Sequence, residues 1–169
     1  MRFSPFVERI SGDGVAAWDI HNAAFEARRR GEDVIILSVG DPDFPTPDFI
    51  TDAAIHALRE GDTHYTEIAG RQALREAIAT RCSGLFGREV NASNVIIVAG
   101  AQNALFAASL CLLTVGDEVI ALDPMYVTYE ATLKASGATL VRVPCSADAG
   151  FRLDAAVLAK AITPKTRAI

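Results

Sequence analysis

From residue 94 onward, short apolar segments alternate regularly with helical segments. The strand-like segments lie near residues 94–98, 117–122 and 139–143, and the helical segments lie near residues 101–113, 127–136 and 154–161. The last three residues, Arg167-Ala168-Ile169, begin a further strand. Strands that alternate with helices form a parallel sheet, and helices then cover both of its faces. The alternation therefore predicts an α/β fold, with a mostly parallel sheet and helices on both faces.

The first ninety residues follow a different pattern. Helices are predicted at residues 14–30, 48–60 and 71–84, and residues 34–37 are predicted to form a short strand. Either Asp48 or Thr46 is expected to cap the second of these helices. The chain stops as a strand begins, and a sheet of three or four strands would leave both of its edges exposed. We therefore expect the sequence to be the first part of a longer protein.

The composition excludes several classes of protein. Of the 169 residues, 50% are hydrophobic and 22% are charged, which is typical of a soluble globular domain rather than a disordered chain. The net charge of −5 argues against nucleic acid as a partner, and no apolar segment approaches membrane-spanning length. The three cysteines are far apart, and the histidines lack partners at metal-ligand spacing. We expect a cytoplasmic protein without a metal site.

The strand predicted at residues 94–98 leads directly into a helix through Gly100-Ala101-Gln102. A sharp strand-to-helix turn leaves backbone N–H groups free at the start of the helix, where the helix dipole adds partial positive charge. Gly100 lets a ligand approach the backbone closely. Such a turn can hold a phosphate group, although taken alone it is more often an ordinary βα connection.

Two tyrosines lie where they could complete a site around this turn. Tyr126 follows the strand predicted at residues 117–122, and Tyr65 lies in a polar loop. A phosphate site beside an aromatic ring favours a flat phosphorylated cofactor over a dinucleotide. Each tyrosine taken alone is more often a packing residue or an exposed loop residue.

Four segments follow one another along the chain: Gly40-Asp41-Pro42-Asp43-Phe44-x-Thr46-Pro47, Tyr65-Thr66-x-x-x-Gly70-x-x-x-Leu74-Arg75, Gly100-Ala101-Gln102-x-Ala104-Leu105 and Asp123-Pro124-x-Tyr126-x-x-Tyr129. In this order they resemble the N-terminal half of the class I/II (fold type I) aminotransferases, which are pyridoxal 5′-phosphate (PLP) enzymes of the aspartate aminotransferase fold. The resemblance covers nearly the whole chain. The opening Arg9-Ile10-Ser11-Gly12-Asp13-Gly14 and Ala17-Trp18-Asp19-Ile20-His21 also resemble arginine–pyruvate transaminases.

The resemblance implies roles for individual residues. The turn at Gly100 and the backbone amides of Ala101 and Gln102 would hold the cofactor phosphate, and Tyr126 would stack on the pyridine ring. Tyr65 would reach the phosphate in the site of the partner subunit, so the family's homodimer would form part of the active site. Gly40 would lie beside the substrate. The substrates would be an amino acid and a 2-oxo acid.

The catalytic lysine that forms a Schiff base with PLP is expected downstream of this sequence. The three lysines, Lys134, Lys160 and Lys165, are predicted to be solvated surface residues, and none has the family's Ser-x-x-Lys context. We therefore assign no catalytic residue and expect the 169-residue chain alone to be inactive. Residues 1–45 would be the N-terminal arm and part of the small domain, and residues 46–169 the first part of the large PLP-binding domain. A PLP-dependent lyase or synthase of the same fold, and a non-catalytic truncated binding fragment, remain as alternatives.

Overall fold

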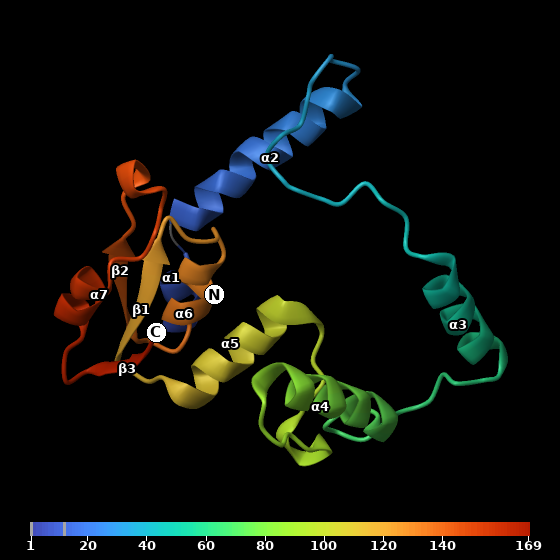
Figure 1. The fold of residues 1–169 in the computed structure, drawn as a ribbon. Coiled ribbons are helices and arrows are strands. Elements are labelled where there is room, and N and C mark those ends of the chain that lie inside the picture. Colours follow the sequence, from blue (N-terminus) through green and yellow to red (C-terminus); the bar gives the residue numbers. More distant parts are fainter. Residues whose placement is uncertain (1, 12) are drawn as a thin grey trace. The chain divides into compact units, whose positions relative to one another are not determined.

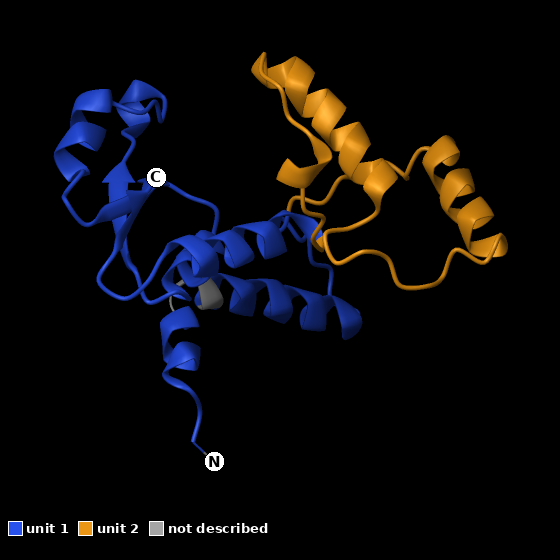
Figure 2. Ribbon diagram, turned by 90° about the horizontal axis from the view of Figure 1, so that it is seen from below, with its two compact units in different colours: residues 1–39, 100–169 blue, residues 40–99 orange. Residues whose placement is uncertain are grey.

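The fold was analysed in a computed structural model, which describes residues 2–11 and 13–169. The chain forms two compact units (Figure 2). Unit 1 comprises Met1–Val39 and Gly100–Ile169, and unit 2 comprises Gly40–Ala99. Unit 1 contains the sheet, and unit 2 is built from helices and loops. No helix in the described residues is long and apolar enough to cross a membrane.

The sheet of unit 1 has three parallel strands in the order β2-β1-β3. The strands are β1 (Glu118–Asp123), β2 (Thr139–Pro144) and β3 (Thr166–Ala168). The β1–β2 pairing is regular along its length, whereas the β1–β3 pairing shifts in register between Glu118 and Val119. The predicted parallel sheet is confirmed, as are its strands near residues 117–122, 139–143 and 167–169.

Helices make up much of the rest of unit 1. They are α1 (Pro5–Ile10), α2 (Asp13–Arg29), α5 (Gly100–Leu112), α6 (Tyr129–Lys134) and α7 (Ala155–Ala161), with a short 3-10 turn at Ala147–Ala149. Helices α6 and α7 both contact β2, and Figure 1 shows them on opposite sides of the sheet. The prediction of helices on both faces is therefore confirmed.

The core of unit 1 lies where β1 meets α5 and α6. Leu113, Val119, Leu133 and Ala138 are buried together. Ile120 in β1 and Val143 in β2 are the most deeply buried large side chains, with 2% and 1% of their surface exposed. Burial of a side chain of this size contributes about 1.5 to 3 kcal/mol to stability. The central strand β1 is therefore held by apolar packing.

Unit 2 contains α3 (Asp48–Arg59), α4 (Gln72–Phe86) and a 3-10 turn (Ala92–Asn94). Arg75 of α4 fastens the segment that follows this turn. Its Nε donates to the carbonyl of Val95 over 2.9 Å, and its Nη2 donates to the carbonyl of Ala92 over 2.5 Å. Hydrogen bonds from a charged donor are stronger than neutral ones, so Arg75 is a strong polar link between α4 and residues 92–95.

Two predicted strands, at residues 34–37 and 94–98, are wrong. Both segments are irregular, although the backbone at Val95 is extended. A strand needs a hydrogen-bonding partner, and in the described part of the chain residues 94–98 have only one backbone–backbone hydrogen bond to another segment, from the Ile97 amide to the Ala69 carbonyl at 2.9 Å. Ile35 and Leu37 are 83% and 88% exposed. These two apolar side chains are therefore not buried by other described residues of the chain.

The predicted cap of α3 is also wrong. Pro47 occupies the N-cap position and makes no side-chain cap hydrogen bond. Asp48 is the first residue of the helix and does not cap it. Its negative charge there interacts favourably with the positive end of the helix dipole. The bounds of the predicted helices agree with the structure within two residues at each end for α2, α3, α4, α5, α6 and α7, and α6 is two residues shorter than predicted at both ends.

A buried carboxylate joins α6 to β2. Glu130 is 8% exposed, and its Oε1 lies 2.6 Å from Nζ of Lys134 while its Oε2 lies 3.0 Å from Nη2 of Arg142. The hydrogen bond from Lys134, followed by the charges of Lys134 and Arg142, holds the pKa of Glu130 below its ordinary value of 4.5. The contacts of Glu130 with Lys134 and Arg142 therefore stabilise the folded state while Glu130 is ionised.

We expect Glu130→Gln to lower the free energy of unfolding at pH 7 by about 1 to 3 kcal/mol, since it leaves two cations without their anion. Because the pKa of Glu130 is lower in the folded state, its contribution is present above pH 4.5 and is lost as the pH falls through the folded pKa. The stability gap between wild type and variant, measured by urea unfolding, should therefore shrink in acid. A gap of equal size at pH 7 and pH 3 would contradict this expectation.

Candidate phosphate and cofactor site

Helix α5 begins at a glycine with a left-handed backbone. Gly100 has φ +83°, at the point where the irregular segment before it meets the helix. A Cβ at this position would meet nothing within 4 Å, so the glycine is required for its backbone angle and not for space within this chain. The same open space leaves the backbone of the turn accessible to a ligand.

The first amides of α5 are free. No described residue accepts a hydrogen bond from the amides of Ala101 and Gln102, and both residues are exposed. The helix has 13 residues, and its first turn carries no acidic side chain that would compete with a bound anion. Free amides and the positive end of a helix dipole are what a phosphate group needs. The chemistry of this turn therefore fits the phosphate of PLP.

Tyr126 presents an aromatic ring in the loop that follows β1. The ring is 56% exposed and packs edge-on against Tyr129, with centroids 5.8 Å apart and planes at 69°. The amide of Tyr129 also donates to the carbonyl of Tyr126 over 3.0 Å, which fixes the turn between the loop and α6. The ring is thus held on one edge while part of its surface stays open, as a stacking residue requires.

A cavity of about 570 Å³ lies beside these tyrosines within unit 1. It is bordered by α5, β1 and α6, and its lining includes Leu105, Leu113, Val119, Tyr126, Tyr129 and Leu133. The hydroxyl of Ser109, which also lines it, donates to the Leu105 carbonyl over 2.8 Å. Most of the lining side chains are apolar. The first residue of α5 that lines the cavity is Leu105, so the cavity does not include the free amides of Ala101 and Gln102.

The remaining predicted site residues belong to unit 2. Tyr65 lies in the loop between α3 and α4 and is fully exposed. Gly40 is exposed, and a Cβ there would meet nothing within 4 Å. The structure therefore places Gly100, Ala101, Gln102 and Tyr126 in unit 1, and Tyr65 and Gly40 in unit 2.

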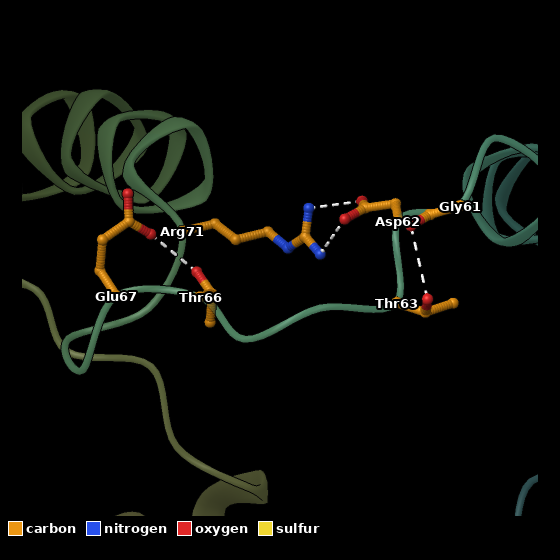
Figure 3. Close-up of polar contacts among 6 residues, drawn as sticks. All are labelled: Gly61, Asp62, Thr63, Thr66, Glu67 and Arg71. Carbon is orange, nitrogen blue, oxygen red and sulfur yellow. Dashed lines mark hydrogen bonds and ion pairs between the residues drawn. The ribbon is translucent and has the colours of Figure 1, made fainter.

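The sequence did not predict a set of polar contacts among residues that lie before and after Tyr65 along the chain. Figure 3 shows the guanidinium of Arg71 facing the carboxylate of Asp62, with two hydrogen bonds of 2.5 and 2.6 Å. In the same loop, the Thr66 hydroxyl donates to Glu67 over 2.7 Å. The two charges are nine residues apart in an irregular segment, so no helical or strand period could have paired them in advance.

The lysines differ from each other in their surroundings. Lys160 and Lys165 are exposed, as predicted. Lys134 is only partly exposed and is paired with the buried Glu130, so it is a structural residue and not a simply solvated one. The cysteines are free thiols, of which Cys145 is buried. Within residues 2–11 and 13–169, no group of His, Cys, Asp and Glu could hold a metal ion.

Comparisons with known proteins identify the family of this chain. The sequence profile of the family described as Aminotransferase class I and II matches residues 32–169. The arginine–pyruvate transaminase AruH of Pseudomonas aeruginosa is 52% identical over 169 residues, which are 100% of this chain and 43% of AruH. The aspartate aminotransferase of Pyrococcus horikoshii is 43% identical over 145 residues, which are 86% of this chain and 37% of that protein.

A solved structure gives the same result for the fold. The aspartate aminotransferase from Thermus thermophilus with maleate superposes with a TM-score of 0.90 at 35% identity, over 98% of this chain and 43% of that one. The chain therefore has the aspartate aminotransferase fold and spans less than half the length of these relatives. The match of the family profile to most of the chain confirms the resemblance found in the sequence, and the protein belongs to the class I and II aminotransferase family.

Proposed function

We propose that the full-length protein is a PLP-dependent aminotransferase that moves an amino group from an amino acid to a 2-oxo acid. Residues 1–169 would supply the N-terminal part, with residues 1–45 in the arm and small domain and residues 46–169 in the large domain. The observation that supports the proposal is the start of α5, where two amides are free in the described part of the chain and no acidic side chain in the first turn competes with an anion. Membership of the aminotransferase family supports PLP as the phosphate-bearing ligand.

The residues of this chain would bind and orient the cofactor. The turn at Gly100 and the amides of Ala101 and Gln102 would hold its phosphate, and Tyr126, held by Tyr129, would cover its ring. Bound PLP supplies an electron sink for the charge that develops when an amino acid loses its α-proton. The lysine that moves this proton is proposed to lie downstream, because the described lysines are exposed or, in Lys134, ion-paired.

We propose L-arginine as the amino donor and pyruvate as the acceptor, on the basis of the 52% identity to arginine–pyruvate transaminase. We also propose a cytoplasmic homodimer in which Tyr65 reaches the phosphate in the partner's site and Gly40 lies beside the substrate. The full exposure of Tyr65 supports its contact with a group outside its own loop. The dimer can be checked by sedimentation of the purified protein.

The test is to purify the full-length protein, confirm its intact mass, and measure bound PLP and the products formed from arginine and pyruvate. Stoichiometric PLP, with alanine and the 2-oxo acid of arginine as products, would support the proposal. Ammonia, carbon dioxide or an eliminated side chain as the main product would favour a lyase or synthase of the same fold. Turnover by the isolated 169-residue chain would contradict the placement of the catalytic lysine downstream.

Removal of the Tyr126 ring should separate stacking from other effects. We expect Tyr126→Ala to weaken PLP binding about 10-fold, because an aromatic stacking partner contributes about 0.5 to 1.5 kcal/mol beyond its buried area. Tyr126→Phe keeps the ring and its contact with Tyr129, so its affinity should stay within about twofold of wild type. Equal losses in both variants, measured by equilibrium titration of the apoenzyme, would contradict a stacking role.

A further inference from the structure

The loop between α3 and α4 carries Tyr65 and is anchored at both ends to helices. At its start, the amide of Asp62 donates to the Ala57 carbonyl of α3 over 3.0 Å. At its end, Arg71 is the N-cap residue of α4. Asp62 therefore lies three residues after the end of α3 and Arg71 directly precedes α4, so a bond between them joins the two ends of the loop.

The bond between these residues is a charged fork. Both guanidinium Nη atoms of Arg71 reach the two carboxylate oxygens of Asp62, at 2.5 and 2.6 Å (Figure 3). The side chains of Arg71 and Asp62 are 50% and 41% exposed. A fork of two parallel hydrogen bonds fixes direction as well as distance, which a single contact between point charges does not.

Few other interactions hold the middle of the loop. The amide of Thr63 donates to Gly61, and the amide of Gly70 donates to Glu67. Among the described residues no backbone hydrogen bond fixes His64, Tyr65 or Thr66, and the Tyr65 side chain makes no hydrogen bond. The position of the Tyr65 ring is therefore set by how the loop is closed and not by contacts of the ring itself.

We propose that the Asp62–Arg71 pair is a latch that closes the loop between α3 and α4 and so positions Tyr65. This role for Tyr65 rests on the proposed function, in which its hydroxyl reaches a cofactor phosphate. Asp62 and Arg71 are positioning residues in this proposal and touch no ligand. Holding the ends of a ten-residue segment together removes conformations that would carry Tyr65 away from its target.

The charge of the latch is stable at neutral pH. The hydrogen bond from Arg71, with its positive charge, holds the pKa of Asp62 below the ordinary value of 3.8. Asp62 in turn raises the pKa of Arg71. Since both groups stay charged at neutral pH, the latch responds to loss of either partner and, as an exposed pair, to high salt.

The first test follows the loop directly, by hydrogen exchange in the full-length apoprotein. We expect Arg71→Ala and Asp62→Ala each to speed exchange about two- to fivefold in the peptide covering residues 62–71, the range expected for an exposed ion pair. Arg71→Lys keeps the charge without the fork and should give an intermediate effect. The control is Arg30→Ala, which removes an exposed pair with Glu32 (2.9 Å) that joins residues only two apart. Unchanged exchange in both latch variants would overturn the proposal.

The second test asks whether the latch acts through Tyr65. We expect Arg71→Ala to weaken PLP binding about two- to fivefold in the wild-type background and to have no further effect in a Tyr65→Phe background. An equal loss in both backgrounds would mean that Arg71 acts independently of Tyr65, and would overturn the positioning role. If Tyr65→Phe alone leaves PLP affinity unchanged, the role of Tyr65 in the proposed function fails, whereas faster loop exchange would still support the latch.

Discussion

Gly70→Ala is expected to lower the free energy of unfolding by about 2 to 5 kcal/mol, the sum of a left-handed backbone penalty and an overpacking penalty. Gly70 is buried and has φ +97°. A Cβ at this position would lie 2.5 Å from the Cβ of Ile97 and would also clash with Cγ1 of that side chain. Because a Cβ does not move when a side chain rotates, the backbone of one segment would have to shift.

The shift would also disturb a hydrogen bond. The Ala69 carbonyl, next to Gly70, accepts from the Ile97 amide over 2.9 Å and ties the loop to the segment before α5. Hydrogen exchange at Ile97 should therefore rise in the variant along with the loss of stability in urea. Gly70 thus has two separate requirements, the backbone angle and the absence of a side chain.

Gly61→Ala is the matched control for this prediction. Gly61 lies in the same unit with φ +80°, but a Cβ there would meet nothing within 4 Å. The control should cost only the backbone penalty of about 1 to 2 kcal/mol. If the two variants were equally stable, the contact with Ile97 would be irrelevant and the backbone angle alone would explain Gly70.

The fold was predictable where local pattern and pairing agree. The strands of unit 1 were located from their apolar runs, because β1, β2 and β3 bond to one another within this part of the chain. Residues 34–37 and 94–98 have the same apolar character but no partner strand among the described residues. The apolar pattern alone therefore predicted two strands that the structure does not contain. A strand depends on another segment, whereas the helix bounds follow from local signals such as Asp154, which caps α7 through the Ala156 amide at 2.8 Å.

The candidate site also has features that the sequence predicts and features that only the structure shows. The free amides at the start of α5 were predictable because a strand-like run, a glycine and a helix follow one another directly in the sequence. The support of Tyr126 by Tyr129 required the ring geometry, and the Asp62–Arg71 fork required the path of an irregular loop. Interactions that depend on side-chain direction in loops have no periodic signature, so they emerge only from the structure.

The start of α5 allows a test in which stability and binding change in opposite directions. We expect Gln102→Glu to weaken PLP binding about 10- to 100-fold, because a carboxylate near the free amides repels the phosphate dianion. The same carboxylate lies in a first turn that has no acidic residue, where it should stabilise the helix by about 0.3 to 1 kcal/mol. PLP titration of the apoenzyme and thermal unfolding without PLP measure the two effects separately.

Gln102→Met provides the control, since it removes the side-chain amide without adding charge. Its PLP affinity should stay within about fivefold of wild type if the backbone amides of Ala101 and Gln102 hold the phosphate, because a side-chain hydrogen bond contributes only about 1 kcal/mol. A loss in Gln102→Met as large as in Gln102→Glu would move the phosphate contact from the backbone to the side chain. A stable Gln102→Glu protein with unchanged PLP affinity would place the phosphate elsewhere, because a carboxylate beside a bound phosphate would repel it.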